Sequence, residues 1–363
     1  MAGDEEILSV ETSVEETAVA EEVVYAPAAP AAVPALDDVQ AIEFCKNSYA
    51  RILSELSKVV VGQSDVVQDI MIAIFTKSHA LLVGVPGLAK TLLIATLAQT
   101  LQMSFRRIQF TPDLMPSDIT GTEVIYQDPQ TGEKQFKFLP GPLFANIVLA
   151  DEINRTPPKT QAAMLEAMQE RRVTVGGTTR DLPKPFFVLA TQNPLEQEGT
   201  YPLPEAQIDR FMMKVIVDYP SRSEERAILD AMATTEAMVT PRAVVSAAQI
   251  VEARHVVNLL YVDDKVRDYI VDLVLATRPP IAATLNLNGY IQNGASPRAT
   301  IALTLAARAT AFLNGRHFVI PQDVKTVALD VLRHRVSVTY EAEAENVSSV
   351  NVIEKILNTL PVP

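Results

Sequence analysis

The segment from residue 84 to residue 91 has the composition of a phosphate-binding loop. It follows the apolar run at residues 80–83, and we predict a buried strand, a tight turn and a helix that begins near Lys90. This arrangement directs backbone N–H groups and a helix N-terminus at a triphosphate. Lys90 would reach the outer phosphates, and the Thr91 hydroxyl would bind Mg²⁺. The residues of the segment are Gly84, Val85, Pro86, Gly87, Leu88, Ala89, Lys90 and Thr91.

The loop departs from the strict pattern at one position. Ala89 precedes the lysine, where the pattern has glycine. We expect alanine to be tolerated there, because a residue that starts a helix needs no positive φ. Taken alone, the segment could also be an ordinary connection between a strand and a helix.

Two adjacent carboxylates end a second apolar run. Residues 147–150 lead directly into Asp151 and Glu152, which we place at the carboxyl edge of a sheet, where open α/β folds bind ligands. Asp151 would orient Mg²⁺ and its waters, and Glu152 would polarise a water for in-line attack on the γ-phosphate. A pair that caps the next helix is the alternative, but it does not explain the upstream loop. The two motifs together predict ATP hydrolysis.

Composition indicates a globular α/β protein. The chain has 363 residues, 48% of them hydrophobic, which is enough for two domains and a sizeable core. No apolar stretch is long enough to span a bilayer, and the acidic N-terminus is unlike a secretory signal, so we expect a cytoplasmic protein. We expect the single cysteine, Cys45, to be a buried small residue. The four histidines do not have the spacing of metal ligands.

The formal charge of −13 is concentrated in the first 40 residues. They hold ten Asp or Glu and no Lys or Arg, which leaves 34 acids and 31 bases in the rest of the chain. The body therefore has no basic stripe, and we expect no nucleic-acid partner. The tail is rich in acids, alanine and proline and predicts a disordered extension. It could recruit a basic partner, although a solubilising or simply tolerated tail is favoured.

Strands and helices alternate between residues 41 and 220, which predicts a parallel five-stranded sheet between helices. Two β-hairpins are inserted, one formed by residues 123–126 and 135–138 and the other by 172–175 and 178–180. A helix is expected at 157–171. The predicted strands are residues 80–83, 105–110, 147–150, 186–190 and 212–217.

After residue 220 the pattern is typical of helices alone, and it predicts a second, all-helical domain at the C-terminus. The predicted organisation is a tail at residues 1–40, an α/β nucleotide-binding domain at 41–220, a linker at 221–240 and the helical domain at 241–363. The expected helices are residues 223–238, 247–259, 264–277, 297–314 and 321–334.

Three further motifs complete a family pattern. Residues 190–194 read Ala-Thr-Gln-Asn-Pro, residues 203–211 read Leu-Pro-Glu-Ala-Gln-Ile-Asp-Arg-Phe, and residues 296–299 read Ser-Pro-Arg-Ala. With the phosphate loop and residues 151–155, the chain strongly resembles the MoxR family of AAA+ ATPases from about residue 41 to 357. The family's loop also carries alanine before lysine. The resemblance implies a P-loop AAA+ core plus a C-terminal all-helical lid domain. It also implies ATP and Mg²⁺ as cofactors, and Gly62 and Gln63 beside the adenine.

The resemblance also implies roles for three polar residues. Asn193 resembles the sensor that positions the attacking water beside Glu152. Arg210 resembles the arginine finger, which enters the nucleotide site of a neighbouring subunit. Arg298 is similar to the second sensor, which reports the γ-phosphate from the lid.

Simpler roles are open for the same residues. Asn193 could open a turn, Arg210 could pair with Asp209 at the surface, and Arg298 could be an exposed residue in the first turn of a helix. Asn154 and Arg155 fit the family's extended second motif without a settled role. Arg155 could serve a contact between subunits.

The resemblance implies a ring, expected to be hexameric, that acts as a chaperone-like remodelling factor. Family members work with separate proteins that carry a von Willebrand factor A domain, often to insert a metal or cofactor or to mature a complex. The hairpins would project from the ring and move with nucleotide state, or simply decorate the sheet. The alternatives are a chelatase-type motor subunit, a nucleotide-gated scaffold without turnover and, less favoured, a nucleic-acid motor. The sequence does not identify the client.

Overall fold

The computed structural model describes residues 38–127, 132–194, 199–233, 239–287 and 289–363. Within residues 38–45 it describes the side chain of Glu43 only. The predictions for the acidic tail and for the side chain of Cys45 therefore lie outside the described residues. Among the described helices, none has the length and apolar composition that crossing a membrane requires.

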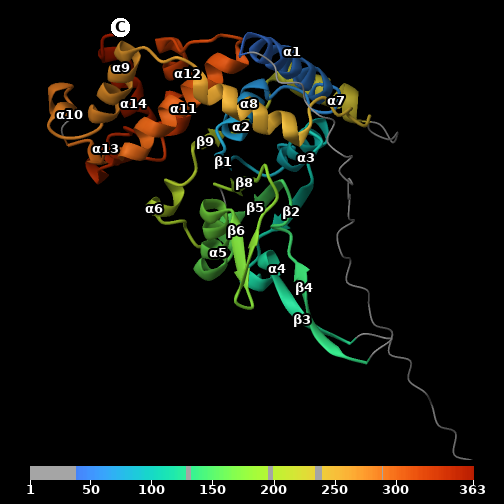
Figure 1. The fold of residues 1–363 in the computed structure, drawn as a ribbon. Coiled ribbons are helices and arrows are strands. Elements are labelled where there is room, and N and C mark those ends of the chain that lie inside the picture. Colours follow the sequence, from blue (N-terminus) through green and yellow to red (C-terminus); the bar gives the residue numbers. More distant parts are fainter. Residues whose placement is uncertain (1–37, 128–131, 195–198, 234–238, 288) are drawn as a thin grey trace, which may run out of the picture.

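A five-stranded sheet forms the centre of the α/β region, as predicted (Figure 1). The strand order is β2-β5-β8-β1-β9, and every neighbouring pair is parallel. The buried apolar runs of β1, β5 and β8 are typical of parallel strands covered on both faces. The strands are β1 (Ala80–Val83), β2 (Phe105–Gln109), β5 (Ile147–Asp151), β8 (Phe187–Gln192) and β9 (Met213–Ile216).

Successive residues of these strands enter two different hydrophobic cores. Leu82 and Leu149 pack in the core that contains α2 and α3, whereas Leu81 and Val148 pack in the core that contains α5 and α4. This division follows from the period of two along a strand. The covering helices are α2 (Ser64–Phe75), α3 (Lys90–Thr100), α4 (Pro116–Thr120) and α5 (Pro158–Glu170).

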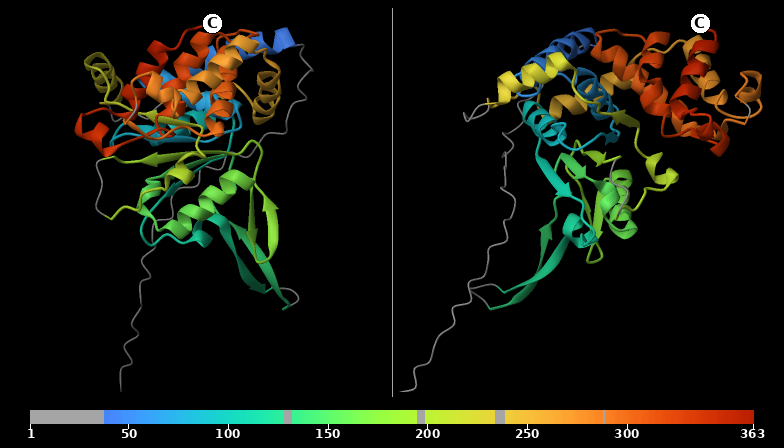
Figure 2. Two further views of the ribbon diagram at one scale, coloured as in Figure 1. Left: turned by 90° about the vertical axis from the view of Figure 1, so that its left-hand side faces the viewer. Right: turned by 180° about the vertical axis from the view of Figure 1, so that it is seen from behind.

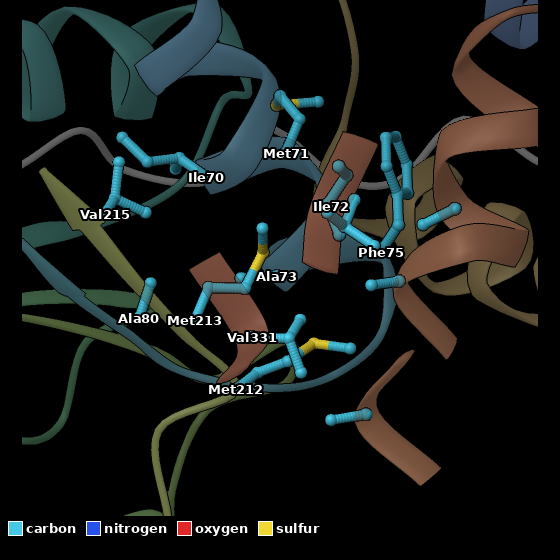
Figure 3. Close-up of a cluster of buried hydrophobic side chains, with 14 of the residues drawn as sticks. Ile70, Met71, Ile72, Ala73, Phe75, Ala80, Met212, Met213, Val215 and Val331 are labelled. Carbon is cyan, nitrogen blue, oxygen red and sulfur yellow. The ribbon is translucent and has the colours of Figure 1, made fainter. Parts of the chain in front are cut away.

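The first of these cores continues into the C-terminal helices. Figure 3 shows Ile72 and Phe75 of α2 near Met213 of β9 and Val331 of α12 (Pro321–Leu332), all with exposed fractions of 6% or less. Helix α8 (Ala247–Leu259) packs on α2 and on α1 (Asp38–Leu56), so it covers the α/β region as well. Because one continuous apolar core joins the two regions, their relative position is stabilised by burial. The boundaries at residues 220 and 240 stay predictions.

The C-terminal region is helical, as predicted, with one addition. Residues Ile291–Asn293 (β10) and Ser337–Val338 (β11) form a small antiparallel sheet where the sequence pattern indicated helices alone. Strands of three and two residues are too short to show a periodicity. The helices are α7 (Arg222–Met232), α8 (Ala247–Leu259), α9 (Asp264–Leu275), α10 (Ile281–Thr284), α11 (Pro297–Leu313), α12 (Pro321–Leu332), α13 (Tyr340–Ala344) and α14 (Ser349–Thr359).

Both predicted hairpins are present. The first, β3 (Gly121–Gln127) with β4 (Lys134–Pro140), projects far from the body of the molecule (Figures 1 and 2). The second, β6 (Arg172–Val175) with β7 (Thr178–Asp181), lies at its base. Arg180 of β7 joins the two through an ion pair with Glu123 at 3.2 Å. The remaining short elements are η1 (Ile153–Arg155) and α6 (Glu205–Ile208).

Candidate functional site

The phosphate loop connects the carboxyl end of β1 to the first turn of α3. Two glycines allow its path. A Cβ on Gly84 would lie 2.6 Å from the carbonyl oxygen of Val217, so only glycine fits there, and Gly87 has a φ of 87°, which favours glycine. Lys90 Nζ donates to the carbonyl of Gly84 at 2.6 Å. The lysine therefore folds back over the loop that it is expected to serve.

The conformation of Ala89 corrects one expectation. Ala89 has a φ of 52° and a ψ of 22°, in the left-handed region, although we expected a residue that needs no positive φ. It precedes the helix as its N-cap, and its carbonyl accepts from the N–H of Leu93 at 2.9 Å. The turn between loop and helix thus requires the left-handed conformation at this position. For a residue other than glycine this costs about 1 kcal/mol.

Asp151 ends β5 at the carboxyl edge of the sheet, as predicted, and it has two partners that the sequence pattern did not indicate. Arg107 of β2 donates to its Oδ2 from Nη2 at 2.6 Å and from Nε at 2.9 Å. Thr191 of β8 donates to its Oδ1 at 2.5 Å. The neighbouring strands therefore hold the carboxylate in one orientation, because β2 and β8 flank β5.

Glu152 follows in the left-handed conformation, with a φ of 56°. Its Oε2 accepts from Gln109 Nε2 at 2.7 Å and from Arg155 Nη1 at 3.1 Å, and its N–H donates to Thr191 Oγ1 at 2.8 Å. Arg155 thus contacts a catalytic candidate of its own chain. Gln109 and Thr191 are functional candidates that sequence reasoning missed. Their signal was weak, since each is only a polar residue at the carboxyl end of an expected strand.

The electrostatics of this edge suit a magnesium nucleotide. Burial lowers the pKa of Lys90, and the nearby carboxylates of Asp151 and Glu152 act against that shift. The described residues include no group of three or more His, Cys, Asp or Glu side chains that could hold a metal ion. Mg²⁺ commonly takes one or two protein oxygens and completes its shell with waters and substrate phosphates, which fits Thr91 and Asp151 as its holders here.

Gly62 and Gln63, the residues expected beside the adenine, are connected to the phosphate loop by a hydrogen bond. Gln63 Nε2 donates to the carbonyl of Leu88 at 3.1 Å, and the side-chain oxygen of Gln63 is buried without a hydrogen-bond partner in the described part of the chain. Gly62 and Gln63 both have positive φ, at 71° and 59°. Helix α7 closes this side, since a Cβ on Gly62 would lie 2.3 Å from a carboxylate oxygen of Glu224. A buried polar atom beside the loop fits a nucleotide base.

Asn193 and Asn154 lie close to the same edge. Asn193 directly follows β8, between β5 and β1 in the sheet, and is only 6% exposed. Asn154 is 9% exposed, and its side-chain oxygen has no hydrogen-bond partner among the described residues. Burial of both amides favours a role at the site over an exposed turn. The structure therefore brings the predicted loop, carboxylates and sensor amide to one edge of the sheet.

Arg210 and Arg298 lie at the opposite edge. The N–H of Met212 bonds the carbonyl of His79, just before β9 and β1 begin, so Arg210 lies at the amino ends of these strands. Four strand residues, about 13 Å at the usual rise, separate this level from the phosphate loop. Arg298 lines the same cavity as Arg210, of about 340 Å³. Neither arginine therefore belongs to the phosphate loop of its own chain.

Asp209 does not pair with Arg210, which was the alternative for that arginine. It instead accepts from Arg335 Nε at 2.8 Å and from Arg298 Nη1 at 3.3 Å. Arg210 Nη1 contacts the carbonyl of Leu165 at 3.4 Å and is exposed. Arg335, only 3% exposed, is a further residue that the sequence did not indicate. It lies three residues after the end of α12 and joins the C-terminal helices to this edge.

Comparisons with known proteins match both the α/β region and the C-terminal helical region. Residues 79–213 match the model of the ATPase family associated with various cellular activities (AAA), and residues 285–356 match an AAA lid domain. Chaperone MoxR1 of Mycobacterium tuberculosis is 45% identical over 318 residues, covering 87% of this chain and 83% of the relative. Protein MoxR of Paracoccus denitrificans is 32% identical over 327 residues, covering 85% and 94%. The crystal structure of a candidate ATPase from Cytophaga hutchinsonii matches with a TM-score of 0.82 at 45% identity, covering 89% and 97%.

Proposed function

This chain belongs to the MoxR family of AAA+ ATPases, and from that premise we propose that it is an ATP-driven, chaperone-like remodelling factor that works as a ring. Its nucleotide sites lie between neighbouring copies. A hexamer is the proposed ring, and the cytoplasm is its proposed location. The finer assignments rest on the site described above.

The separation of the two sheet edges carries this proposal. The loop, Asp151 and Glu152 stand at the carboxyl edge, whereas Arg210 and Arg298 stand at the amino edge of the same sheet. A phosphoryl transfer gains several orders of magnitude from a cation placed on the transferring group. Since Arg210 lies too far from the loop of its own chain, a second copy must supply that cation. Head-to-tail contacts of this kind generate closed rings when the rotation closes.

Each side chain has a definite task in this mechanism. The N–H groups between Gly84 and Lys90 bind the phosphates, and the Lys90 ammonium balances their charge. Thr91 and Asp151 would hold Mg²⁺, which supplies neutralisation of phosphate charge when bound. Arg107 and Thr191 keep Asp151 oriented for that role.

Glu152 is the proposed general base. Its carboxylate would accept the proton of the attacking water, while Asn193 would help to position that water. Gln109 and Arg155 bond Glu152 Oε2 in this structure and so fix the carboxylate near the end of β5. The neighbour's Arg210 would then stabilise charge on the transferring phosphoryl group.

The remodelling role rests on relatives and on the first hairpin. One relative is named a chaperone. At the projecting hairpin, Ile125 lies opposite Phe136, and the two residues are 66% and 76% exposed. A pair of large apolar side chains so far from the body supports contact with a client protein. A separate partner with a von Willebrand factor A domain is part of the proposal, whereas the class of client is left open.

The dependence of ATP turnover on protein concentration tests this function. With purified full-length chain and Mg²⁺, turnover per chain should rise as the protein assembles, and sedimentation should show the ring over the same concentration range. A scaffold without turnover would assemble with ATP and release no phosphate. Constant turnover at concentrations where the chain is monomeric would contradict a site shared between copies.

A further inference from the structure

The cavity beside Arg210 contains more positive charge than the proposed function uses. It has a volume of about 340 Å³ and lies between the end of α5, the turn before β1 and the first turns of α11. His79 also lines it, but burial lowers the pKa of His79 to about 4, so this ring is neutral. One carboxylate, Asp209, faces five cations: Lys77, Arg171, Arg210, Arg298 and Arg335.

Asp209 is already shared by two of these cations. Arg335 and Arg298 contact its two oxygens at 2.8 Å and 3.3 Å. No carboxylate among the described residues is within ion-pair distance of Lys77, Arg171 or Arg210. Three cations therefore border one cavity without a counter-charge from this part of the chain.

Arg171 and Lys77 are held next to each other. Arg171 caps the C-terminus of α5 in the left-handed conformation, and its Nη2 donates to the carbonyl of Lys77 at 2.9 Å. Its Nε is buried and has no hydrogen-bond partner among the described residues. Repulsion by Arg171 is the largest cause that lowers the pKa of Lys77, and Arg254 and Lys184 add to it.

Only part of this arrangement is explained within the chain. The carbonyl of Leu165, within α5, attracts Arg210, whose Nη1 donates to it at 3.4 Å. That attraction does not satisfy the buried Nε of Arg171 or the ammonium of Lys77. Holding like charges together and leaving a buried donor unpaired both cost free energy. An anion in the cavity would lower the cost of holding the like charges together.

We propose that Lys77 and Arg171 bind phosphate groups of the nucleotide held by a neighbouring copy, beside Arg210 and Arg298. This inference rests on the proposed function, since it needs a neighbour's nucleotide at this cavity. The occupant is a nucleotide phosphate because the same cavity contains the two arginines that the shared site requires. Lys77 and Arg171 then contact further phosphate groups of the same nucleotide, next to those that Arg210 and Arg298 contact.

The double variant Lys77→Gln, Arg171→Gln tests the proposal, with Arg172→Gln as the matched control. Arg172 is the next residue, is 55% exposed and pairs only with Glu170 at the surface among the described residues. The double variant should lower kcat/KM for ATP by about 10-fold to 100-fold, the usual range for lost charged contacts. Thermal unfolding should show no loss of stability beyond that of the control variant, and nucleotide binding by the dilute chain should match the wild type. Wild-type turnover in the double variant would overturn the proposal.

Mixed rings separate this inference from the proposed function. The double variant is mixed with the Glu152→Gln variant. Where the two meet, the double variant supplies an intact phosphate loop and Glu152, and the Glu152→Gln chain supplies an intact cavity. Turnover should therefore recover in the mixture. A mixture of Arg210→Ala with Glu152→Gln is the reference. Recovery in the reference alone would overturn the role of Lys77 and Arg171, whereas recovery in neither mixture would overturn the shared site itself.

The alternative occupant of the cavity is a free phosphate compound in place of the neighbour's nucleotide. Calorimetry with inorganic tripolyphosphate, at protein concentrations below assembly, probes it. If the wild type binds this probe, the double variant does not, and both hydrolyse ATP equally, the cavity serves a free anion and the proposal is wrong. Loss of turnover in the double variant, together with recovery in the mixed ring, supports the neighbour's nucleotide.

Discussion

The two edges of the central sheet differ in how their charges are balanced. At the carboxyl edge, Asp151 pairs with Arg107 and Glu152 pairs with Arg155, while Lys90 faces both carboxylates. At the amino edge, the carboxylate of Asp209 pairs with two of the five cations that line the cavity. A sheet that builds a balanced edge and an unbalanced edge on one chain is suited to bind an anion between copies. The difference supports the proposal that half of the nucleotide site lies on each side of the subunit.

The largest expected effect comes from the unbalanced edge. Arg210→Ala should lower turnover by about 10³-fold or more, because the transferring group loses its trans cation. ATP affinity, measured with a fluorescent nucleotide on the dilute chain, should stay the same, since Arg210 lies at the edge away from the phosphate loop. The exposed Arg226 of α7 gives a control variant, Arg226→Ala. Normal turnover of Arg210→Ala at every protein concentration would remove this arginine from the site.

Glu152→Gln tests the balanced edge. The amide cannot take a proton from water, so turnover should fall by roughly 10²-fold to 10⁴-fold while ATP is still bound and the ring still forms. Steady-state hydrolysis and nucleotide binding are measured on the same preparation. Glu166→Gln, an exposed position on α5, is the control. Wild-type turnover in Glu152→Gln would exclude it as the general base.

Ala89→Gly tests the left-handed backbone conformation of residue 89 in the phosphate loop at the carboxyl edge. Glycine adopts the left-handed conformation at residue 89 without steric cost, so the free energy of unfolding should rise by up to about 1 kcal/mol. Greater freedom of the unfolded chain offsets part of this gain. Urea unfolding measures the change. A loss of more than about 1 kcal/mol would mean that Ala89 does not keep a positive φ in solution.

The smallest expected effects have opposite signs at the two edges. Arg107→Gln removes a partner of Asp151 and should lower the free energy of unfolding by a few tenths of a kcal/mol, since Arg107 is 47% exposed. Lys77→Gln removes repulsion with Arg171 and should raise the free energy of unfolding. The increase should be of similar size or smaller, because solvent screens the exposed Lys77. Urea unfolding at low and high salt measures both. The difference between the two changes in unfolding free energy should shrink as salt is added. Changes of the same sign at low salt would contradict the contrast between the two edges.

Much of the fold was predictable because its signals are local. The apolar runs of β1, β5 and β8 and the strand segments of both hairpins report their own structure. The sheet β10-β11 was not predicted, since its strands are too short and are joined by contacts between residues 291 and 338. The phosphate loop and the carboxylate pair were predicted as local motifs. Their detailed roles stay predictions until the variants are measured.

The partners of the site could not be read from the chain. Arg107 and Asp151 are 44 positions apart, and Arg335 and Asp209 are 126 positions apart. Nothing in either residue's neighbourhood in the sequence indicates the other. The left-handed conformation of Ala89 was also hidden, because alanine usually avoids it.

By itself, the sequence determined the chemistry that is available: a loop that can bind phosphates, a carboxylate pair at a strand end and two arginines in family motifs. These signals are local, since they depend on residues that are adjacent in the chain. Only the tertiary structure decided which groups share an edge. Parallel strands carry every carboxyl end to one side and every amino end to the other. For that physical reason Lys90 and Glu152 meet at one side of the sheet, whereas Arg210 lies at the other side, away from them.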